Sequence, residues 1–456
     1  MDKSTARHTL LAFRQELYAQ TLGHRKDTLF ELMEAALVSP GPMTLVRLSL
    51  APTFHRGWAS APDALSDGSL DAAQCRRLLH RYLDAPVVYG RVLWALDGTS
   101  WPRPAATTSA ERTYCHRTNP GQPQNGIVPG WDYQWLVAIP EAAGSWVLPL
   151  DVQRRSPTVG TPTALALSQV RTALAQRPAS AARPVVTLDS SYDVIELAQA
   201  VQSGDPTIRL DADVLVRLSS RRRFYRPPPP YQGRGCRPKH GAVFRLHQPA
   251  THGEPDHTAV GEDPRHGQIR VDVWEGLHAQ WAATTPFPLV RVQVARLPKA
   301  GRTPKPLWLA WIGQEVPSDL LDLWRWYAQR FTIEHGFRFA KHELGWTTVR
   351  PRAPTAADHW TWLLALAFAE LYLLRGLVAD QRLPWERPQA PMQLTPGRVR
   401  RASAGILAAL ASPTRAVRAR GKAPGRQPGQ CPGPQPTFTV VRRTPQPVPS
   451  RRKAAA

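Results

Sequence analysis

VLWALDGTSWPRP, residues 92–104, is the stretch of sequence on which the expected fold depends. Its apolar part, residues 92–96, is short and is followed by a glycine and two prolines, which is typical of a buried strand. The strand is expected to end at Asp97, directly before Gly98. A carboxylate at a strand end can point into a crevice at the edge of a sheet, but aspartate is also a common turn former there. The stretch therefore predicts a strand and leaves the role of Asp97 open.

A second stretch of the same form, PVVTLDSSYDV, occupies residues 184–194. Here residues 185–188 are the apolar run, and Asp189 ends it. Hard divalent cations such as Mg²⁺ prefer oxygen ligands, and carboxylates supply both the ligands and the compensating charge. Asp97 and Asp189 are therefore candidate metal ligands, although each of them taken alone is more simply explained as a turn residue.

The sequence around these two aspartates predicts an α/β core. Further short apolar runs are bounded by Gly, Pro and Asn, as strands are, and longer periodic segments between them indicate helices. The expected strands are at residues 92–96, 134–139, 146–150, 185–188, 208–218, 289–295 and 307–312. The expected helices of this core are at residues 162–176 and 192–202, with one long helix from about residue 318 and another at residues 360–378. The order of these elements is that of the RNase H-like fold.

Five regions are expected along the 456 residues. Residues 1–88 carry apolar residues at helix-like spacing and are expected to form a helical, DNA-binding domain. Residues 89–218 and 291–380 are expected to form the two parts of the RNase H-like core. Between them, residues 219–290 are expected to form a β-rich basic insertion. Residues 381–456 are rich in Pro and Arg and are expected to be a basic, largely disordered tail with one short helix around residues 406–410.

The segment WYAQRFTIEHGFRFAKHELGW, residues 326–346, is predicted to lie on the long helix. Tyr327, Arg330, Glu334 and Lys341 are offset by 0, 3, 7 and 14 residues. At about 100° per residue, all four lie within one narrow stripe of a helix. A simple ion pair across one turn would explain Arg330 and Glu334, but it would not explain the spacing of the other two residues.

The pattern Tyr-x2-Arg-x3-Glu-x6-Lys resembles the signature of bacterial insertion-sequence transposases of the DDE class, the cut-and-paste group with an RNase H-like core. The resemblance extends to Tyr192, an aromatic residue three positions after Asp189, whereas Ser191 stands where Gly or Ala is commoner. The second Asp and the Glu of this family often flank a β-rich insertion, and the 145 residues from Asp189 to Glu334 leave room for one. The resemblance covers roughly residues 90–378.

The resemblance implies a metal site and a reaction. Asp97, Asp189 and Glu334 would hold two Mg²⁺ (or Mn²⁺) ions that flank the scissile phosphate. One ion would lower the pKa of an attacking water or 3′-hydroxyl, and the other would stabilise the leaving oxygen. The enzyme would cleave DNA strands at the inverted repeats that end a transposon and join them to target DNA. By resemblance, it would act as a homodimer in a synaptic complex.

The resemblance also implies contacts with DNA. Arg330 and Lys341 would contact phosphates near the cleavage site, and Tyr327 would contact the backbone of the transposon end. Such enzymes can flip a base near the cut and stack it on an aromatic residue. Trp308 is placed suitably for that role on the strand before the signature, but it is equally compatible with the core.

The charge of the chain points to a polyanionic partner. Its formal net charge is +23, from 58 Lys and Arg against 35 Asp and Glu. Nucleic acid is the natural partner of such a chain, although a high-GC genome would also raise the arginine content without any functional demand. We favour DNA because the charge is clustered. Arg221, Arg222, Arg223 and Lys239 of the insertion are expected to contact phosphates, with a solvated proline-rich loop as the alternative.

Two other basic segments carry the same ambiguity. A helix expected at residues 70–83 has a basic face with Arg76, Arg77 and Arg81, which is compatible with a DNA-reading helix or with an ordinary solvated face. No Asp or Glu follows Glu386, so the tail is a polycation that either binds DNA or is solvated.

Other classes of protein are not indicated. The four cysteines have no CxxC spacing, which argues against both a zinc site and a disulfide framework. Residues 360–378 are apolar but contain Glu370 and Arg375, so they predict a buried helix and no membrane span. The N-terminus lacks the continuous apolar stretch of a signal peptide. We expect a cytoplasmic protein associated with the nucleoid.

Two alternative functions stay open. A transposase-derived DNA-binding regulator without catalytic activity would keep the basic surface and the fold. Another RNase H-like nuclease, such as a resolvase, would keep the acidic residues, but the Tyr-Arg-Glu-Lys stripe argues against it.

Overall fold

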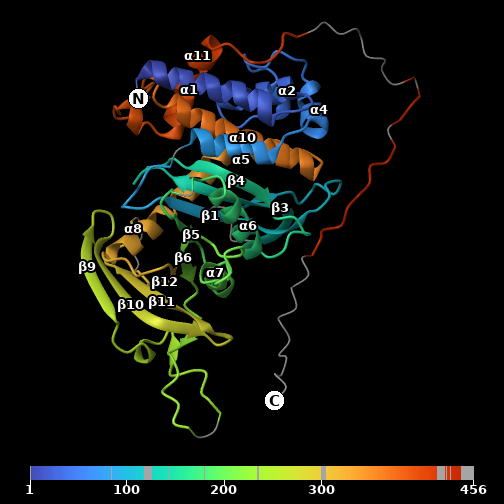
Figure 1. Ribbon diagram of the computed structural model, residues 1–456. Helices are drawn as coiled ribbons and strands as arrows, with labels where there is room; N and C mark the ends of the chain where they lie inside the picture. The colour runs from blue at the N-terminus through green and yellow to red at the C-terminus, as the bar shows by residue number, and fades with distance from the viewer. Residues whose placement is uncertain are drawn as a thin grey trace.

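The computed structural model has a layer of helices against one large sheet (Figure 1), so the α/β class predicted from the sequence is confirmed. It describes residues 2–83, 85–117, 126–142, 144–178, 180–233, 236–298, 304–417, 427, 429–431 and 433–442. Among these residues, no helix is both long and apolar enough to cross a membrane.

The helices that precede the sheet gather around a much later helix, α10 (Pro354–Leu374), as Figure 1 shows. α10 is buried along most of its length because it is apolar on nearly every side. Proline at its first position suits a helix start, where the amide hydrogen would have no helical partner. The helices around it are α1 (Lys3–Glu16), the π-helical turn η1 (Leu17–Thr21), α2 (Lys26–Val38), α3 (Leu45–Leu48), α4 (Ser60–Asp67) and α5 (Ala72–Tyr82).

Arg14 of α1 connects three of these helices. Its Nη1 atom donates to the Glu34 carboxylate of α2 and, at 2.6 Å, to the Glu370 carboxylate of α10. All three side chains are almost fully buried. Residues 1–88 therefore pack around α10, and their buried residues belong to the same hydrophobic core.

The sheet contains strands from the whole middle of the chain. Its order is β2-β3-β1-β5-β6-β12-β11-β10-β7-β8, with β4 paired to β3 and β9 paired to β10. β3 is antiparallel to β1, whereas β5 is parallel to both β1 and β6. The strands are β1 (Leu93–Pro102), β2 (Thr113–Arg117), β3 (Gly126–Ile139), β4 (Leu148–Arg154), β5 (Val185–Leu188), β6 (Asp213–Leu218), β7 (Arg223–Tyr225), β8 (Val243–Arg245), β9 (His257–Asp263), β10 (Gly267–Ala279), β11 (Ala282–Val294) and β12 (Leu307–Ile312).

Two helices pack beside the parallel strands at the centre of the sheet. α6 (Pro162–Leu174) begins after Thr161, whose side chain accepts a hydrogen bond from the Ala164 amide. α7 (Val194–Val201) begins after Asp193, whose side chain accepts hydrogen bonds from the Ile195 and Glu196 amides. Two short 3-10 turns, η2 (Pro249–Thr251) and η3 (Pro391–Gln393), lie in later loops.

The prediction of one long helix around the signature is wrong in one respect, because the structure divides this segment into two helices. α8 (Leu321–Gln329) ends and α9 (Thr332–His342) begins on either side of a tight turn. In that turn the Ile333 amide donates to the Arg330 carbonyl and the Glu334 amide donates to the Phe331 carbonyl, each at 3.1 Å. These are bonds between residues three apart, so the turn is wound more tightly than an α-helix.

The expectation of a largely disordered tail is wrong for its first part. Residues Pro396–Ala409 form α11, which packs on α2 and α10 and is longer than the short helix expected near residue 406. Its arginines are paired within the fold: Arg398 with Asp380 at 3.0 Å, and Arg401 with Glu386 at 2.8 Å.

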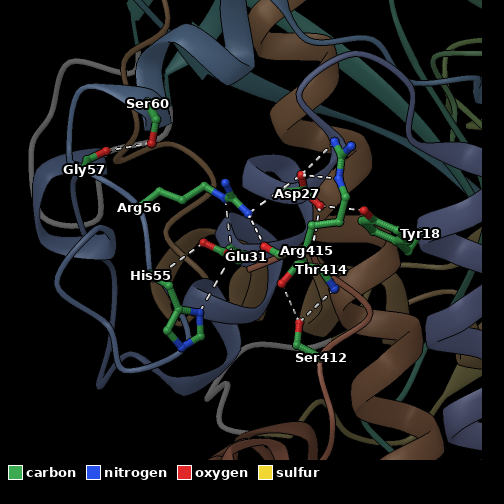
Figure 2. A network of polar contacts seen from close by, with 10 residues as sticks. All are labelled: Tyr18, Asp27, Glu31, His55, Arg56, Gly57, Ser60, Ser412, Thr414 and Arg415. Carbon is green, nitrogen blue, oxygen red and sulfur yellow. Dashed lines mark hydrogen bonds and ion pairs between the residues drawn. The ribbon is translucent and has the colours of Figure 1, made fainter. Parts of the chain in front are cut away.

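The chain after α11 is also attached to the helical layer. Figure 2 shows Arg415 donating to Asp27 of α2, with 3.1 Å between Nη2 and Oδ2. Asp27 in turn accepts a hydrogen bond from the Tyr18 hydroxyl. Further along, residues 433–442 run beside residues 107–112, where the Phe438 amide donates to the Thr107 carbonyl at 2.9 Å. The remaining basic positions of the predicted tail, which are Arg418, Arg420, Lys422, Arg426, Arg443 and residues 451–453, lie outside the described residues.

Candidate active site

The two aspartates found in the sequence lie opposite each other in the sheet. β1 and β5 are parallel, and their register pairs Ala95 with Thr187. Two residues further on, the same register sets Asp97 opposite Asp189, on neighbouring chain segments that are about 4.8 Å apart. Asp189 directly follows β5, as expected, but the strand expected to end at Asp97 continues to Pro102 because it stays paired with β3, so Asp97 lies in the middle of β1. Burial raises the pKa of Asp97, and the negative charge of Asp189 raises it further, whereas Arg330 lowers it. Asp189 is therefore close enough for its charge to affect the ionisation of Asp97.

Each carboxylate is already held by hydrogen bonds. Asp97 accepts from the Gly98 amide at 2.7 Å and from Arg330 Nη1, also at 2.7 Å. Asp189 accepts from the Ser191 amide at 2.9 Å and from the Ser191 hydroxyl at 2.6 Å, both through its Oδ1 atom. These bonds fix the orientation of both side chains before any ligand binds.

The turn between α8 and α9 places Arg330 and Tyr327 beside the aspartates. The Arg330 side chain is only 6% exposed, and its charge is balanced by Asp97. Among the described residues, neither Arg330 Nε nor the Tyr327 hydroxyl has a hydrogen-bond partner, although both atoms are buried. Burial also raises the pKa of Tyr327, which therefore keeps its proton. Arg330 Nε and the Tyr327 hydroxyl are therefore two buried polar atoms beside the aspartates whose hydrogen-bonding capacity is unused.

α9 continues along β1. Lys341 Nζ donates to Thr99 Oγ1 at 2.6 Å, two residues beyond Asp97. Burial lowers the pKa of Lys341, whereas the nearby charges of Glu334 and Asp132 raise it. Glu334 itself is exposed. The structure thus brings Arg330 and Lys341 against the strand that carries Asp97, and it places Tyr327 within electrostatic reach of Asp189.

A divalent cation suits the donor atoms of this site. Asp97 and Asp189 offer only carboxylate oxygens, which are the ligands that Mg²⁺ and Mn²⁺ prefer. Within the part of the chain that the structure describes, however, no three His, Cys, Asp or Glu side chains lie together as ligands for a metal ion. The structure therefore pairs Asp97 with Asp189, and it does not gather Glu334 with them.

The role suggested for Trp308 is contradicted by its burial. Trp308 on β12 is 3% exposed and packs against Phe244, His252 and Trp274. A side chain enclosed in this way has no free face on which a flipped base could stack. Of the two interpretations that the sequence allowed, the structure supports the core residue.

The basic residues of the insertion lie in the chain that follows β6. Arg221 and Lys239 are exposed, Arg222 is half-buried, and Arg223 is exposed on β7 with a 3.1 Å hydrogen bond to Gln280. β7 is six strands away from β1 in the sheet order. At about 4.8 Å per strand, this separation is roughly 29 Å for Arg223. Arg221 and Arg222 precede β7 and follow the end of β6, which is only two strands from β1, so they lie nearer to the aspartates along the chain than Arg223 does.

The basic face predicted on α5 is largely used within the fold. Arg76 pairs with Asp151 of β4 at 2.6 Å, and Arg81 pairs with Glu16 of α1. Such pairs favour the structural interpretation of this helix, because arginines that are bound to carboxylates are less available to phosphates.

A further set of residues near the aspartates was missed in the sequence. Arg155 Nε donates to Gln134 Oε1, and Arg155 Nη2 donates to the Tyr192 hydroxyl, each at 2.9 Å. The Arg155 guanidinium also lies directly over Gly98, where an added Cβ would come within 2.6 Å of it. The partners of Arg155 are distant in sequence, so no local pattern points to them. The glycine after Asp97 was the one available signal.

Comparison with known proteins identifies a family whose match includes the two aspartates. No curated protein matches this sequence. The family model described as DDE superfamily endonuclease matches residues 17–280, which include both Asp97 and Asp189 but not Glu334. Because the match covers more than half of the 456 residues, the chain belongs to the DDE superfamily of endonucleases.

Proposed function

We propose that the protein is a DNA transposase that cleaves DNA strands at the ends of a mobile element and joins them to target DNA. The observation that carries this proposal is the Asp97–Asp189 pair, which lies just beyond the last paired residues of the parallel strands β1 and β5, with Arg330 of the signature bonded to Asp97. Membership of an endonuclease superfamily gives the reaction class. The signature residues supply the narrower assignment to insertion-sequence transposases.

The order of the central strands supports an RNase H-like core. β4, β3, β1, β5 and β6 are neighbours in that order, with the first three antiparallel and the last three parallel. β7–β11 extend the same sheet between Asp189 and the signature, which supports a β-rich insertion at that point.

In the proposed mechanism, Asp97, Asp189 and Glu334 hold two Mg²⁺ or Mn²⁺ ions. When bound, these ions would activate the attacking hydroxyl and neutralise the leaving oxygen. Arg330 would offer its unused Nε to a phosphate oxygen, and the neutral Tyr327 hydroxyl would donate a second hydrogen bond to the backbone. Lys341 would add positive charge beside Thr99, two residues after Asp97 on β1. These residues would thus orient the scissile strand across the carboxylates.

The proposed partner is double-stranded DNA. The net charge of +23 favours binding to phosphates, and the exposed arginines near β7 would contact DNA away from the cleavage site. We also propose that two copies assemble with two element ends in a synaptic complex. This arrangement would place the basic surface of the insertion on DNA that the carboxylates do not touch.

The test is strand cleavage of DNA that carries the element's terminal inverted repeats, with Mg²⁺ or Mn²⁺. The wild type is expected to nick at the repeat boundary and to join the freed 3′ end to target DNA. Asp97→Asn and Asp189→Asn are expected to bind the same DNA without cleaving it. Binding without cleavage by the wild type would instead support a regulator. Equal cleavage by the wild type and Asp97→Asn would show that the catalytic assignment is wrong.

A further inference from the structure

We propose that Arg155 is a positioning residue that fixes the separation of Asp97 and Asp189, given that these two carboxylates hold metal as proposed above. Arg155 is not part of the signature. It approaches the aspartates from the face of the sheet that α6 and α7 cover, whereas the signature residues belong to α8, α9 and the turn between them. Its guanidinium lies over Gly98 of β1 and bonds to Tyr192 in the turn after β5, and it thereby connects the two segments that carry the aspartates.

The position of Arg155 follows from the alternation of side chains along a strand. Arg155 comes directly after β4, and its amide donates to the Asp132 carbonyl at 2.8 Å, so the pairing with β3 continues through it. Successive side chains of a strand point to opposite faces. Arg154 therefore faces α10, where it pairs with Asp358 at 3.0 Å. Arg155 faces the side of the sheet that α6 and α7 cover.

The partners of Arg155 are themselves fixed. Gln134, which accepts from Arg155 Nε, is fully buried, and its own amide donates to Gln169 Oε1 of α6 at 2.9 Å. Tyr192, which accepts from Arg155 Nη2, is 2% exposed, and its ring lies 5.7 Å from the guanidinium carbon. A planar guanidinium that bonds two immobile partners is held in one orientation. A flexible surface arginine is not fixed in this way.

This orientation brings Arg155 to both aspartates through their neighbours. Gly98 directly follows Asp97, and the guanidinium lies so close to it that an added Cβ would be 2.6 Å away. Tyr192 closes the turn that begins at Asp189 and includes the bonds from Ser191. Burial raises the pKa of Tyr192, Arg155 lowers it, and Asp97 and Asp189 raise it. The Tyr192 hydroxyl is therefore within electrostatic reach of all three charged groups.

A connection is needed at this point because the strand pairing stops short of the aspartates. The paired residues of β1 and β5 end with Ala95 and Thr187. Two carboxylates that face each other repel, and the strands that carry them would separate beyond the last paired residues. A two-metal site needs its ions about 3.5–4 Å apart, so the spacing of its ligands must be fixed closely. Arg155 supplies a link between β1 and the turn after β5, because its guanidinium lies over Gly98 and bonds to Tyr192.

The experiment measures Mn²⁺ affinity by titration calorimetry of the full-length protein, together with its thermal unfolding. Arg155→Ala is expected to weaken Mn²⁺ binding by about tenfold or more, as is usual when a residue that orients metal ligands is removed. Arg155→Lys is expected to fail to restore it, because an ammonium cannot span both Gln134 and Tyr192. The control is Arg154→Ala, which removes the ion pair with Asp358 and is expected to lower the Tm while Mn²⁺ affinity stays within about twofold.

A second pair of variants separates a positioning role from loss of the fold. Gly98→Ala is expected to weaken Mn²⁺ binding in the wild type, since the new Cβ displaces the guanidinium. In the Arg155→Ala background the same change is expected to have little further effect, because the atoms it would strike are gone. Equal reductions of affinity in both backgrounds, or an Arg155→Ala protein with wild-type Mn²⁺ affinity, would overturn the inference.

Failure of the inference is distinguishable from failure of the proposed function. If the wild type binds Mn²⁺, Asp97→Asn abolishes this binding and Arg155→Ala does not change it, then the carboxylates hold metal and Arg155 does not position them. If the wild type binds no Mn²⁺ in a way that depends on Asp97, the proposed metal site itself is overturned, and the role of Arg155 is overturned with it.

Discussion

At the scale of single residues, the Asp97 carboxylate depends on a balance between burial and charge. Burial and the neighbouring Asp189 both disfavour its ionised form, whereas the ion pair with Arg330 favours it. Arg330 is itself buried, so neither partner can turn to water if the other is removed. A buried charge without its partner is costly, and this cost can be measured.

Arg330→Ala is expected to lower the free energy of unfolding by about 3 kcal/mol, because it leaves Asp97 buried and unpaired. Adding Asp97→Asn to this variant is expected to restore part of the stability, since the unpaired charge is then gone. Chemical denaturation of the two single variants and the double variant measures the coupling. Strictly additive effects on stability would contradict the direct pairing of these residues.

Trp308 gives a test of core against DNA contact at the same scale. Trp308→Ala is expected to cost about 4 kcal/mol of stability, because it leaves a cavity among Phe244, His252 and Trp274. Trp308→Phe keeps most of the packing and is expected to leave DNA cleavage unchanged at a temperature where the variant is folded. A folded Trp308→Phe variant with strongly reduced cleavage would show that Trp308 contacts DNA.

Residue roles were predictable where the pattern was local. Asp97 and Asp189 each follow an apolar run of a few residues, and the sequence predicted a strand end at both. This is correct for Asp189 but wrong for Asp97, because β1 continues as a less apolar strand to Pro102. Trp308 has the same kind of neighbours as any core or interface tryptophan, and only tertiary contacts separate the two roles. Arg155 was missed because its partners Gln134 and Tyr192 are brought to it by the pairing of β3 with β4 and by the turn before α7.

At the scale of elements, strands buried on both faces were the easiest to find. β5 and β12 have the bounds expected from their apolar runs, because both lie inside the sheet between other strands. β2 and β9 were missed, and each pairs with one neighbour only. β9 exposes most of its side chains, so its sequence lacks the apolar signal of a strand. The break between α8 and α9 left no signal either, since its residues keep helical dihedral angles.

α11 provides a prediction about the first part of the expected tail. Arg400 is buried and donates to the Ala36 carbonyl at 3.2 Å and to the Ser39 carbonyl, which closes the end of α2. Arg400→Ala is expected to cost about 2 kcal/mol of stability, because the carbonyls lose a charged donor. Its neighbour Arg401 makes a more exposed pair with Glu386, so Arg401→Ala serves as the control, with little change in Tm. Similar Tm values for both variants would show that α11 is not a structural part of the core.

The basic surface near β7 gives a prediction about DNA affinity. Replacing Arg221, Arg222 and Arg223 by Gln is expected to lower the slope of log affinity against log salt by about 0.9 for each phosphate that these arginines neutralise. Arg325→Gln is the matched control, because this exposed arginine is already paired with Asp319 and Asp322. A salt dependence that changes equally in both variants would show that the insertion has no special role in DNA binding.

At the scale of the whole molecule, the helical layer and the sheet share one hydrophobic core. Residues 1–88 were expected to be a separate domain, because nothing in their sequence reveals that α10 will lie among them. The buried cluster of Arg14, Glu34 and Glu370 joins the N-terminal helices to a helix from the last quarter of the chain. Two glutamates share one arginine there, so one carboxyl tends to keep its proton.

Stability is therefore expected to depend on pH. Burial raises the pKa of Glu34 to about 8, the charge of Glu370 raises it too, and Arg14 opposes the shift. The folded protein then holds a proton that the unfolded chain releases near the ordinary value of 4.5. This contribution to stability is complete below pH 4.5, falls as the pH rises towards 8, and is lost above that value. The Tm of Glu34→Gln is expected to fall less than that of the wild type between pH 5 and pH 8, and parallel curves would contradict the shift.

The most direct measurement for the proposed site is an anomalous difference map from crystals of the protein bound to DNA in the presence of Mn²⁺. Peaks are predicted about 2.1 Å from carboxylate oxygens of Asp97 and Asp189, with Glu334 completing the ligands. A map without peaks at these two aspartates, from crystals in which DNA crosses β1 and β5, would contradict the assignment of Asp97 and Asp189 as the metal ligands of a DNA-cleaving enzyme.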